Sequence, residues 1–284
     1  MFDNFPKIRE ALPQAYQEIY EQFYKSNREG EGVASGLAQK LERWLHYKVA
    51  NDTQGISGHK TLEIGAGTLN QISYEKDFSH YDIIEPFKAL YKDSPKLQHI
   101  NAIYKDIAEI AQSSDINGGG GVNTNADKIS AFAKFHIESP ASLESTQSIK
   151  SQIQSPFYDR IISCAVLEHI ANLPEVVAHS CLLLKDDGVF SAAIPSQARF
   201  LWTMAYKLST GIEFRLKYKL DYDVIMNYEH INTQKEIVEI CDYFFDSVKK
   251  SLFGVCDELS IYTHLSCRKP NRQRAMDYLA LLKS

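Results

Sequence analysis

The segment KTLEIGAGTLNQ, residues 60–71, joins a short apolar run to two glycines. Glycines directly after a strand allow the backbone to approach a bound nucleotide closely, because they carry no side chain and accept turn conformations. A dinucleotide site requires the pattern G-x-G-x-x-G, whose third glycine permits close packing of helix on strand. Asn70 stands where that third glycine belongs. The segment therefore predicts a nucleotide-binding turn and disfavours a site for NAD.

Two carboxylates accompany the glycines. Glu63 is expected to be buried at the strand end, two residues before Gly65, where a carboxylate is costly unless it gains a partner. Backbone amides of the turn or a cationic ligand would supply that partner. S-adenosylmethionine (SAM) carries a sulfonium and an ammonium group, whereas the pyrophosphate of NAD would be repelled. Glu85 ends the next apolar run, YDIIEPF, and can accept both ribose hydroxyls of either cofactor. Glu85 alone therefore does not discriminate between the two cofactors, whereas Glu63 favours SAM.

Two later segments add candidate site residues. In AIYKDIAEI, residues 102–110, Asp106 either caps a helix or contacts a ligand, and Ile107 could lie against a purine. In YDRIISCAVLEHI, residues 158–170, an apolar strand is followed by His169. Ligands bind at the carboxyl ends of strands in open α/β sheets, so His169 is a candidate general base. Alternatively, it caps the strand through a backbone hydrogen bond.

The elements that position these residues alternate between strands and helices from residue 61 onward, which indicates an α/β sheet. We expect strands near 60–64, 81–85, 99–103, 158–164, 188–194, 246–253 and 259–267. A helix is expected to start with Asn172 as its N-cap and to end before a turn at Gly188. A second helix starts at a capping box formed by Thr233 and Glu236. Residues 1–55 are interpreted as an N-terminal helical cap, and residues 271–284 as a C-terminal tail helix.

In their order and spacing, five segments resemble the class I SAM-dependent methyltransferases: LEIGAGT, IIEPF, KDI, DRIISCAVLEHI and LLLKDDGVFSAAIP. The resemblance spans roughly residues 58–267 and is closest to the subgroup acting on small molecules and sugars. It implies a Rossmann-like α/β domain over 56–270, with helices on both faces of seven strands ordered 3-2-1-4-5-7-6 and strand 7 antiparallel. Leu69 replaces the family's third motif glycine. The cofactor contacts that the resemblance implies are Glu63, Gly65, Ala66, Gly67, Glu85, Pro86, Asp106, Ile107, Cys164 and Ala165.

Two segments lie outside this alternation. Residues 112–156 are rich in Ser, Asn, Gln and Gly, which indicates a flexible insertion. Residues 197–232 combine aromatic and basic side chains, which suit a lid over a sugar-like or anionic acceptor. An amphipathic hairpin packed on the sheet and a shallow membrane-surface contact are the alternatives. The candidate acceptor contacts are Tyr24, Arg28, Glu168, Arg199, Trp202 and Arg215, and His230 is a second candidate base from the lid.

The resulting hypothesis is a methyltransferase of the EC 2.1.1 class. It would move the SAM methyl group by in-line displacement to a hydroxyl or amine of a small molecule or a surface-glycan or nucleotide-sugar precursor, leaving S-adenosylhomocysteine. A non-catalytic SAM-fold binding subunit and an NAD(P)-dependent oxidoreductase are the alternatives. The net charge of −5 disfavours a nucleic-acid partner, and no apolar run has transmembrane length. Five scattered cysteines suit a cytoplasmic protein, and we expect no metal site. A homodimer is compatible with the sequence.

Overall fold

Seven strands form one mixed sheet. The computed structural model describes residues 2–20, 36–112 and 156–282. The strands run in the order β3-β2-β1-β4-β5-β7-β6; β7 is antiparallel to both neighbours, and the other pairs are parallel. This is the sheet that the resemblance implied. Its strands are β1 Lys60–Ile64, β2 His80–Ile84, β3 Ala102–Tyr104, β4 Tyr158–Cys164, β5 Leu184–Pro195, β6 Phe245–Gly254 and β7 Ser260–Pro270.

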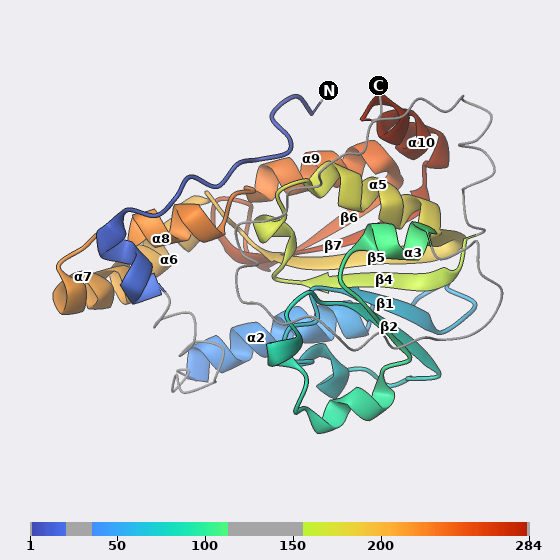
Figure 1. The fold of residues 1–284 in the computed structure, drawn as a ribbon, viewed down its shortest axis with the longest axis horizontal. Helices are drawn as coiled ribbons and strands as arrows, with labels where there is room; N and C mark the ends of the chain where they lie inside the picture. The colour runs from blue at the N-terminus through green and yellow to red at the C-terminus, as the bar shows by residue number, and fades with distance from the viewer. Residues whose placement is uncertain (1, 21–35, 113–155, 283–284) are drawn as a thin grey trace.

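Helices cover both faces of the sheet (Figure 1). On one face, α5 (Leu173–Leu183) packs against α9 (Gln234–Phe244), α10 (Arg272–Leu281) and α3 (Ile107–Gln112). On the other, α2 (Gly36–Ala50) packs on β4, β5 and β7. Three short 3-10 turns, η1 (Gln71–Ser73), η2 (Lys88–Leu90) and η3 (Pro95–His99), contribute residues in or next to them to the same apolar cluster as α2. Each face has its own buried apolar cluster, so the carboxyl edge of the central strands is held between two packed layers.

The capping box at the start of α9 is confirmed. Thr233 Oγ1 accepts a hydrogen bond from the Glu236 amide at 3.3 Å, and Glu236 Oε2 accepts one from the Thr233 amide at 2.8 Å. Asn172 is the N-cap of α5, but its side chain makes no capping hydrogen bond. Its side-chain Nδ2 donates to the Glu175 carboxylate instead. The N-cap position was therefore correctly predicted, and the capping interaction was not.

Two strand boundaries differ from the prediction. The strand predicted near 188–194 begins earlier, because β5 starts at Leu184; its pairing with β4 shifts register between Leu184 and Val189, so Gly188 lies in an irregularity of the strand and not in a separate turn. A Cβ at Gly188 would lie 2.8 Å from the Leu184 side chain and 3.0 Å from the carbonyl oxygen of Asp159, so close packing requires the glycine. The third strand is limited to Ala102–Tyr104, because η3 occupies the preceding residues with Ser94 as its N-cap.

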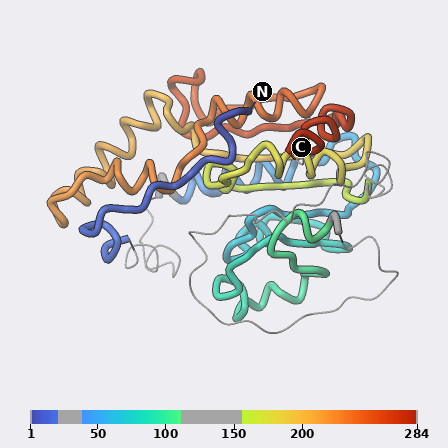
Figure 2. The backbone as a smooth tube through the Cα atoms, turned by 45° about the horizontal axis from the view of Figure 1, so that its top comes forward, coloured from blue at the N-terminus to red at the C-terminus, as the bar shows by residue number. Residues whose placement is uncertain are grey.

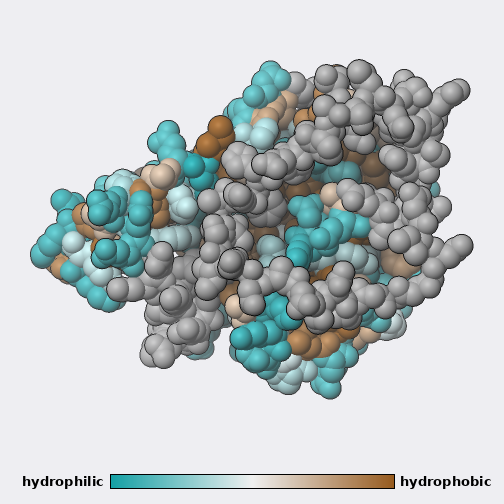
Figure 3. All heavy atoms as spheres, viewed as in Figure 1, coloured by the Kyte–Doolittle hydropathy of each residue, from teal (hydrophilic) through white to brown (hydrophobic). Residues whose placement is uncertain are grey.

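An arm extends from the sheet (Figures 1 and 2). It comprises α6 (Phe200–Tyr206), the short π-helix η6 (Lys207–Gly211), α7 (Ile212–Tyr218) and α8 (Tyr222–Glu229). A helical stretch over residues 14–20 packs there, with Leu12 and Tyr16 against Phe214 and Ile225. Part of the expected N-terminal cap and the expected lid therefore share one core. Figure 3 shows hydrophobic and hydrophilic residues mixed on the arm's surface. Its exposed apolar side chains recur every four residues, at Phe200, Met204, Leu208, Ile212 and Leu216.

Among the described residues, no helix is both long enough and apolar enough to cross a membrane.

Candidate functional site

The glycine turn after β1 has three residues in the left-handed backbone region: Gly65 at φ +72°, Gly67 at φ +52° and Leu69 at φ +63°. The two glycines serve different purposes. A Cβ on Gly65 would lie 2.5 Å from both Cγ atoms of Val166, so this glycine permits close packing on the segment after β4. A Cβ on Gly67 would meet no atom of the described residues within 4 Å. Gly67 therefore borders open space, as a backbone that cradles a ligand must.

Leu69 occupies the position of the family's third motif glycine and keeps the backbone conformation of a glycine. Its side chain is fully buried in the cluster beneath β1 and β2. A left-handed non-glycine residue costs about 1–2 kcal/mol, and burial of a leucine side chain contributes a similar amount. Burial of the Leu69 side chain therefore offsets the cost of its left-handed backbone.

Glu85 connects the end of β2 to the glycine turn. Its Oε2 accepts a hydrogen bond from the Gly67 amide at 2.8 Å, and its Oε1 accepts one from the Phe87 amide at 2.9 Å. A carboxylate oxygen has two lone pairs, so one oxygen can accept hydrogen bonds from a backbone amide and from a ribose hydroxyl at the same time. Pro86 lies between the two backbone contacts and is half-buried. The carboxylate predicted from the sequence therefore lies directly beside the open space at Gly67.

Glu63 is buried as expected, but its partner differs from the expected ones. The hydroxyl of Tyr81, on β2, donates to Glu63 Oε2 at 2.8 Å. Burial raises the pKa of Glu63 to about 8, a rise that this hydrogen bond opposes. The chain itself thus supplies a partner, and the need for a cationic ligand at this carboxylate is weaker than the sequence suggested. The tyrosine was missed because its proximity to Glu63 depends on the pairing of β1 with β2.

The residues predicted to contact the adenine and those predicted at the end of β4 differ in how exposed they are. Asp106 Oδ1 accepts a hydrogen bond from the Ala108 amide at 2.8 Å, which is the helix-capping alternative, here at the start of α3. Ile107 is only 4% exposed and packs in the core. At the end of β4, the Cys164 thiol donates to the side-chain oxygen of Gln71 at 3.3 Å. Ala165 follows, exposed and left-handed at φ +53°.

Three polar side chains gather where β4 ends. Glu168 and His169 lie in the turn η5 (Leu167–His169), and His230 follows α8 as its C-cap. The two imidazole rings are 4.8 Å apart between centroids and nearly perpendicular, at 80°. His169 Nδ1 lies 2.8 Å from the carbonyl oxygen of Glu229, the last residue of α8, so its backbone hydrogen bond reaches another segment and does not cap β4. The structure therefore brings together both predicted histidines, from segments far apart in the sequence.

Burial controls the protonation of this cluster. It lowers the pKa of His230 to about 3, and His169 and Arg9 add a smaller repulsion. It raises the pKa of Glu168, which is 1% exposed, to about 8. His230 is therefore neutral at physiological pH. A base with so low a pKa accepts protons poorly, which makes His169 the better candidate base of the two.

Two residues that the sequence reasoning missed hold the cluster in place. Asn232 donates from Nδ2 to the carbonyl oxygens of Leu167 at 2.8 Å and Ile170 at 2.7 Å, which ties the segment after His230 to η5. Arg9 Nη2 donates to the His169 carbonyl oxygen at 2.5 Å. No sequence signal marked Arg9. Asn232 could have been noticed as a polar residue directly before the capping box.

The predicted acceptor residues are dispersed. Trp202 is nearly buried, and its ring lies 5.6 Å from that of His230, tilted by 32°. Arg199 points elsewhere, with its guanidinium bound to Gln234 at 2.5 Å and to Glu258 at 2.8 Å. Arg215 is exposed on α7, in the arm (Figure 1). Tyr24 and Arg28 lie outside the described residues, as does nearly all of the expected insertion at 112–156.

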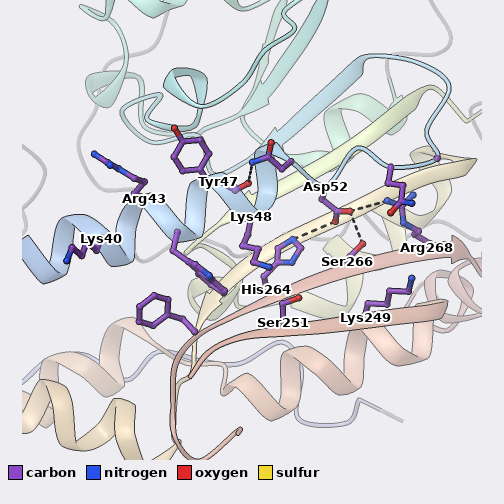
Figure 4. A pocket seen from close by; sticks show the side chains of 15 residues that line it. Lys40, Arg43, Tyr47, Lys48, Asp52, Lys249, Ser251, His264, Ser266 and Arg268 are labelled. Atoms are coloured by element: carbon purple, nitrogen blue, oxygen red, sulfur yellow. Dashed lines mark hydrogen bonds and ion pairs between the residues drawn. The ribbon is translucent and has the colours of Figure 1, made fainter. Parts of the chain in front are cut away.

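A separate cavity of about 990 Å³ lies between α2 and the strands β6 and β7 (Figure 4). Its lining is basic, and Asp52 balances part of that charge by accepting hydrogen bonds from Ser266 Oγ and Arg268 Nη2, both at 3.0 Å. His264 lies 3.6 Å from the same carboxylate. The lining includes none of the residues of the glycine turn or the histidine cluster. We therefore treat this cavity as distinct from the candidate site.

No protein-family model matches this chain, and neither does any curated protein. Among solved structures, it is similar to the CurJ carbon methyltransferase at 16% identity and a TM-score of 0.49, covering 91% of this chain but only 62% of that one. It is similar to the 1,6-didemethyltoxoflavin-N1-methyltransferase of Burkholderia thailandensis at 13% identity, with 92% of each chain covered and a TM-score of 0.49. A SAM-dependent methyltransferase from Archaeoglobus fulgidus gives 12% identity, 89% and 100% coverage, and a TM-score of 0.48. The strand order and antiparallel β7 are those of the class I methyltransferase fold.

Proposed function

We propose that this chain is a SAM-dependent methyltransferase. One observation carries the proposal: Gly67 borders open space with a left-handed backbone, and its amide holds the Glu85 carboxylate at the edge of that space. The site lies at the carboxyl ends of β1, β2 and β4. In open α/β sheets, this is the edge at which nucleotide ligands bind.

The residues around the glycine turn fit SAM. Gly65, Ala66 and Gly67 would border its methionine part, Glu85 would accept its ribose hydroxyls, and Asp106 would lie on its adenine side. Ile107 packs in the core, so it would support this segment and not contact the ring. Glu63 would support the turn from behind through its hydrogen bond with Tyr81. When bound, SAM supplies a methyl group that its sulfonium has already activated. The protein has then mainly to orient the acceptor, and orientation can supply a large part of the rate acceleration.

For a hydroxyl acceptor, His169 would take the proton. The carbonyl oxygen of Glu229 can only accept a hydrogen bond, so His169 Nδ1 carries a proton and the lone pair of the neutral ring lies on Nε2. The same carbonyl would stabilise the imidazolium after proton transfer. Trp202 and His230 would form an aromatic wall beside it. An amine acceptor would need only to arrive deprotonated.

The proposal extends to the acceptor class. A small molecule or a surface-glycan precursor such as a nucleotide-sugar would suit the aromatic and basic side chains of the lid segment 197–232. We propose that the protein acts in the cytoplasm and that a homodimer is compatible with this activity.

Calorimetry with SAM and S-adenosylhomocysteine tests the cofactor. Wild-type protein should bind both, and Glu85→Ala should weaken SAM binding at least tenfold. Glu239→Ala, which removes an exposed carboxylate on α9, is the matched control and should bind like wild type. If wild type bound neither ligand at millimolar concentration, the proposal would be wrong. If Glu85→Ala bound SAM with unchanged affinity, only the assignment of Glu85 to the ribose hydroxyls would be wrong.

A methyl-transfer screen read by mass spectrometry tests the reaction, using nucleotide-sugars, glycan fragments, phenols and small acids as acceptors. Turnover with one acceptor class would identify the substrate chemistry. SAM binding without turnover across the panel would instead favour a non-catalytic binding subunit, and a thermal shift with NAD(H) but not SAM would favour an oxidoreductase.

A further inference from the structure

We propose that Glu168, His169 and His230 bind a divalent transition-metal ion, and that this ion holds an oxygen atom of the methyl acceptor. The second part rests on the proposed function; the first does not. The sequence predicted no metal site, because its cysteines are scattered and the two histidines lie far apart in the chain.

The geometry of the three side chains suits a shared ion. One ligand atom from each residue lies within 4.8 Å of the other two, and His169 Nε2 is 3.8 Å from Glu168 Oε1. At a bond length of about 2.1 Å, neighbouring ligands of one ion lie about 3.0–3.4 Å apart, and only a pair on opposite sides reaches about 4.2 Å. Small side-chain rotations would therefore bring all three atoms into coordination distance.

Each imidazole is held by its other nitrogen. His169 Nδ1 lies 2.8 Å from the Glu229 carbonyl oxygen, and His230 Nδ1 lies 3.0 Å from Gln197 Oε1. Donation from Nδ1 to an oxygen places the lone pair of each neutral ring on Nε2. Metal-binding histidines in proteins almost always make this kind of outer hydrogen bond, which selects the tautomer and orients the ring.

Glu168 provides an independent indication of a ligand. Its side chain is 1% exposed, and Oε2 has no hydrogen-bond partner among the described residues. A buried carboxylate oxygen without a partner costs free energy, and a bound cation would remove that cost. The backbone N–H of Asn232 donates to the backbone carbonyl oxygen of Glu168 at 3.0 Å. This bond keeps Glu168 close to the segment that carries His230.

Two imidazoles and one carboxylate favour zinc, manganese, iron(II) or cobalt(II) over magnesium or calcium, which prefer oxygen ligands alone. Three protein ligands leave coordination positions open for a substrate oxygen. Arg9 contributes a nearby positive charge that opposes binding of the ion. Its guanidinium hydrogen-bonds the carbonyl oxygens of His169, Tyr228 and Glu229.

The ion would have a defined task in methyl transfer to a hydroxyl. With the ion bound, His169 Nε2 is a ligand and no longer acts as the base, so the ion takes over that task. Coordination lowers the pKa of the hydroxyl, the O–H bond breaks and the proton passes to solvent. The oxygen then forms a bond to the methyl carbon of SAM, and the C–S bond breaks with its electron pair remaining on sulfur. The products are the methyl ether of the acceptor, S-adenosylhomocysteine and one proton. Acceptors with a second oxygen next to the hydroxyl, such as sugars and hydroxy acids, could chelate the ion.

The test uses cobalt(II) as the probe, because its visible absorption reports coordination by nitrogen and oxygen ligands. Metal-free full-length protein should bind one cobalt(II) ion per chain, and zinc should displace it. Glu168→Gln and His230→Asn should each weaken cobalt binding at least tenfold. His179→Asn is the matched control, because His179 also lies near a carboxylate, 3.9 Å from Glu175. Absence of cobalt binding in the wild type, or equal loss in the control, would overturn the proposal.

Two further measurements keep the outcomes separable. If Glu168→Gln does not fold, as judged by circular dichroism, His230→Asn and His169→Asn decide the assignment. SAM calorimetry on the same preparations distinguishes this site from the cofactor site: Glu85→Ala should lose SAM and keep cobalt, and His230→Asn should do the reverse. Failure of cobalt binding with intact SAM binding would overturn the metal site alone, whereas failure of SAM binding would overturn the proposed function alone.

Discussion

Substitution of the two motif glycines should have clearly different consequences. Gly65→Ala introduces a Cβ that lies 2.5 Å from both Cγ atoms of Val166, at a backbone φ of +72°. Gly67→Ala also places an alanine in the left-handed region, at φ +52°, but its Cβ meets nothing within 4 Å among the described residues. The first substitution therefore adds a steric clash to backbone strain, and the second adds backbone strain alone.

The magnitudes follow from these two terms. Left-handed backbone costs a non-glycine residue about 1–2 kcal/mol, and overpacking a buried contact costs about 1–3 kcal/mol more. Gly65→Ala should therefore lower the free energy of unfolding by about 2–5 kcal/mol, and Gly67→Ala by about 1–2 kcal/mol. Cofactor affinity should be disproportionately sensitive to Gly67→Ala, because the new methyl group occupies the open space beside Glu85.

Urea unfolding followed by circular dichroism measures both effects, and SAM calorimetry measures the affinity. The double variant Gly65→Ala/Val166→Ala is the informative control, because it removes the clashing methyl groups and leaves the backbone strain. It should recover about 1–3 kcal/mol relative to the sum of the two single changes. Equal destabilisation by the two glycine substitutions, or no recovery in the double variant, would refute the reasoning.

Three more predictions concern stability and are read by the same unfolding measurement. Because burial raises the pKa of Glu63 to about 8, the folded chain holds a proton that the unfolded chain releases above pH 4.5. The free energy of unfolding of wild type, relative to that of Glu63→Gln, should therefore fall by about 1.4 kcal/mol per pH unit between about pH 4.5 and 8. A difference between the two proteins that does not change with pH would contradict this. Glu75→Gln breaks the buried ion pair with Arg160, at 2.7 Å, and should cost about 3–5 kcal/mol; a loss as small as that of the exposed control Glu239→Gln would show that the pair is dispensable. Thr233→Ala removes the α9 cap and should cost about 1 kcal/mol, whereas Thr233→Ser keeps the capping hydroxyl and should cost little; an equal loss in both would contradict the capping role.

Much of the fold was predictable because it depends on local patterns. The apolar run of β4 is almost wholly buried, as expected for a central parallel strand covered by helices on both faces. The capping box at Thr233 predicted the start of α9 correctly. Gly188 was misread because a glycine after a helix resembles a turn signal, whereas here it permits contact between the backbone of β5 and the Leu184 side chain.

The site was predictable where it depends on a single turn and a single strand end. Gly65, Gly67 and Glu85 lie next to one another because parallel strands bring their carboxyl ends to the same edge of the sheet. The partner of Glu63 was not predictable, because Tyr81 reaches it only through the register of β1 with β2. The burial of Glu168 was likewise not predictable, since it arises in the folded chain, where the Asn232 backbone amide also bonds the Glu168 carbonyl oxygen.

The sequence by itself determined the strand-and-helix alternation, the nucleotide-type turn and the carboxylate that faces it, because each of these follows from residue types at short spacing. Only the tertiary structure decided which distant side chains meet. His169 and His230 are neighbours because the arm returns the chain to the end of β4 and Asn232 ties it there. Contacts of this kind depend on the path of the whole chain, and no local pattern encodes them.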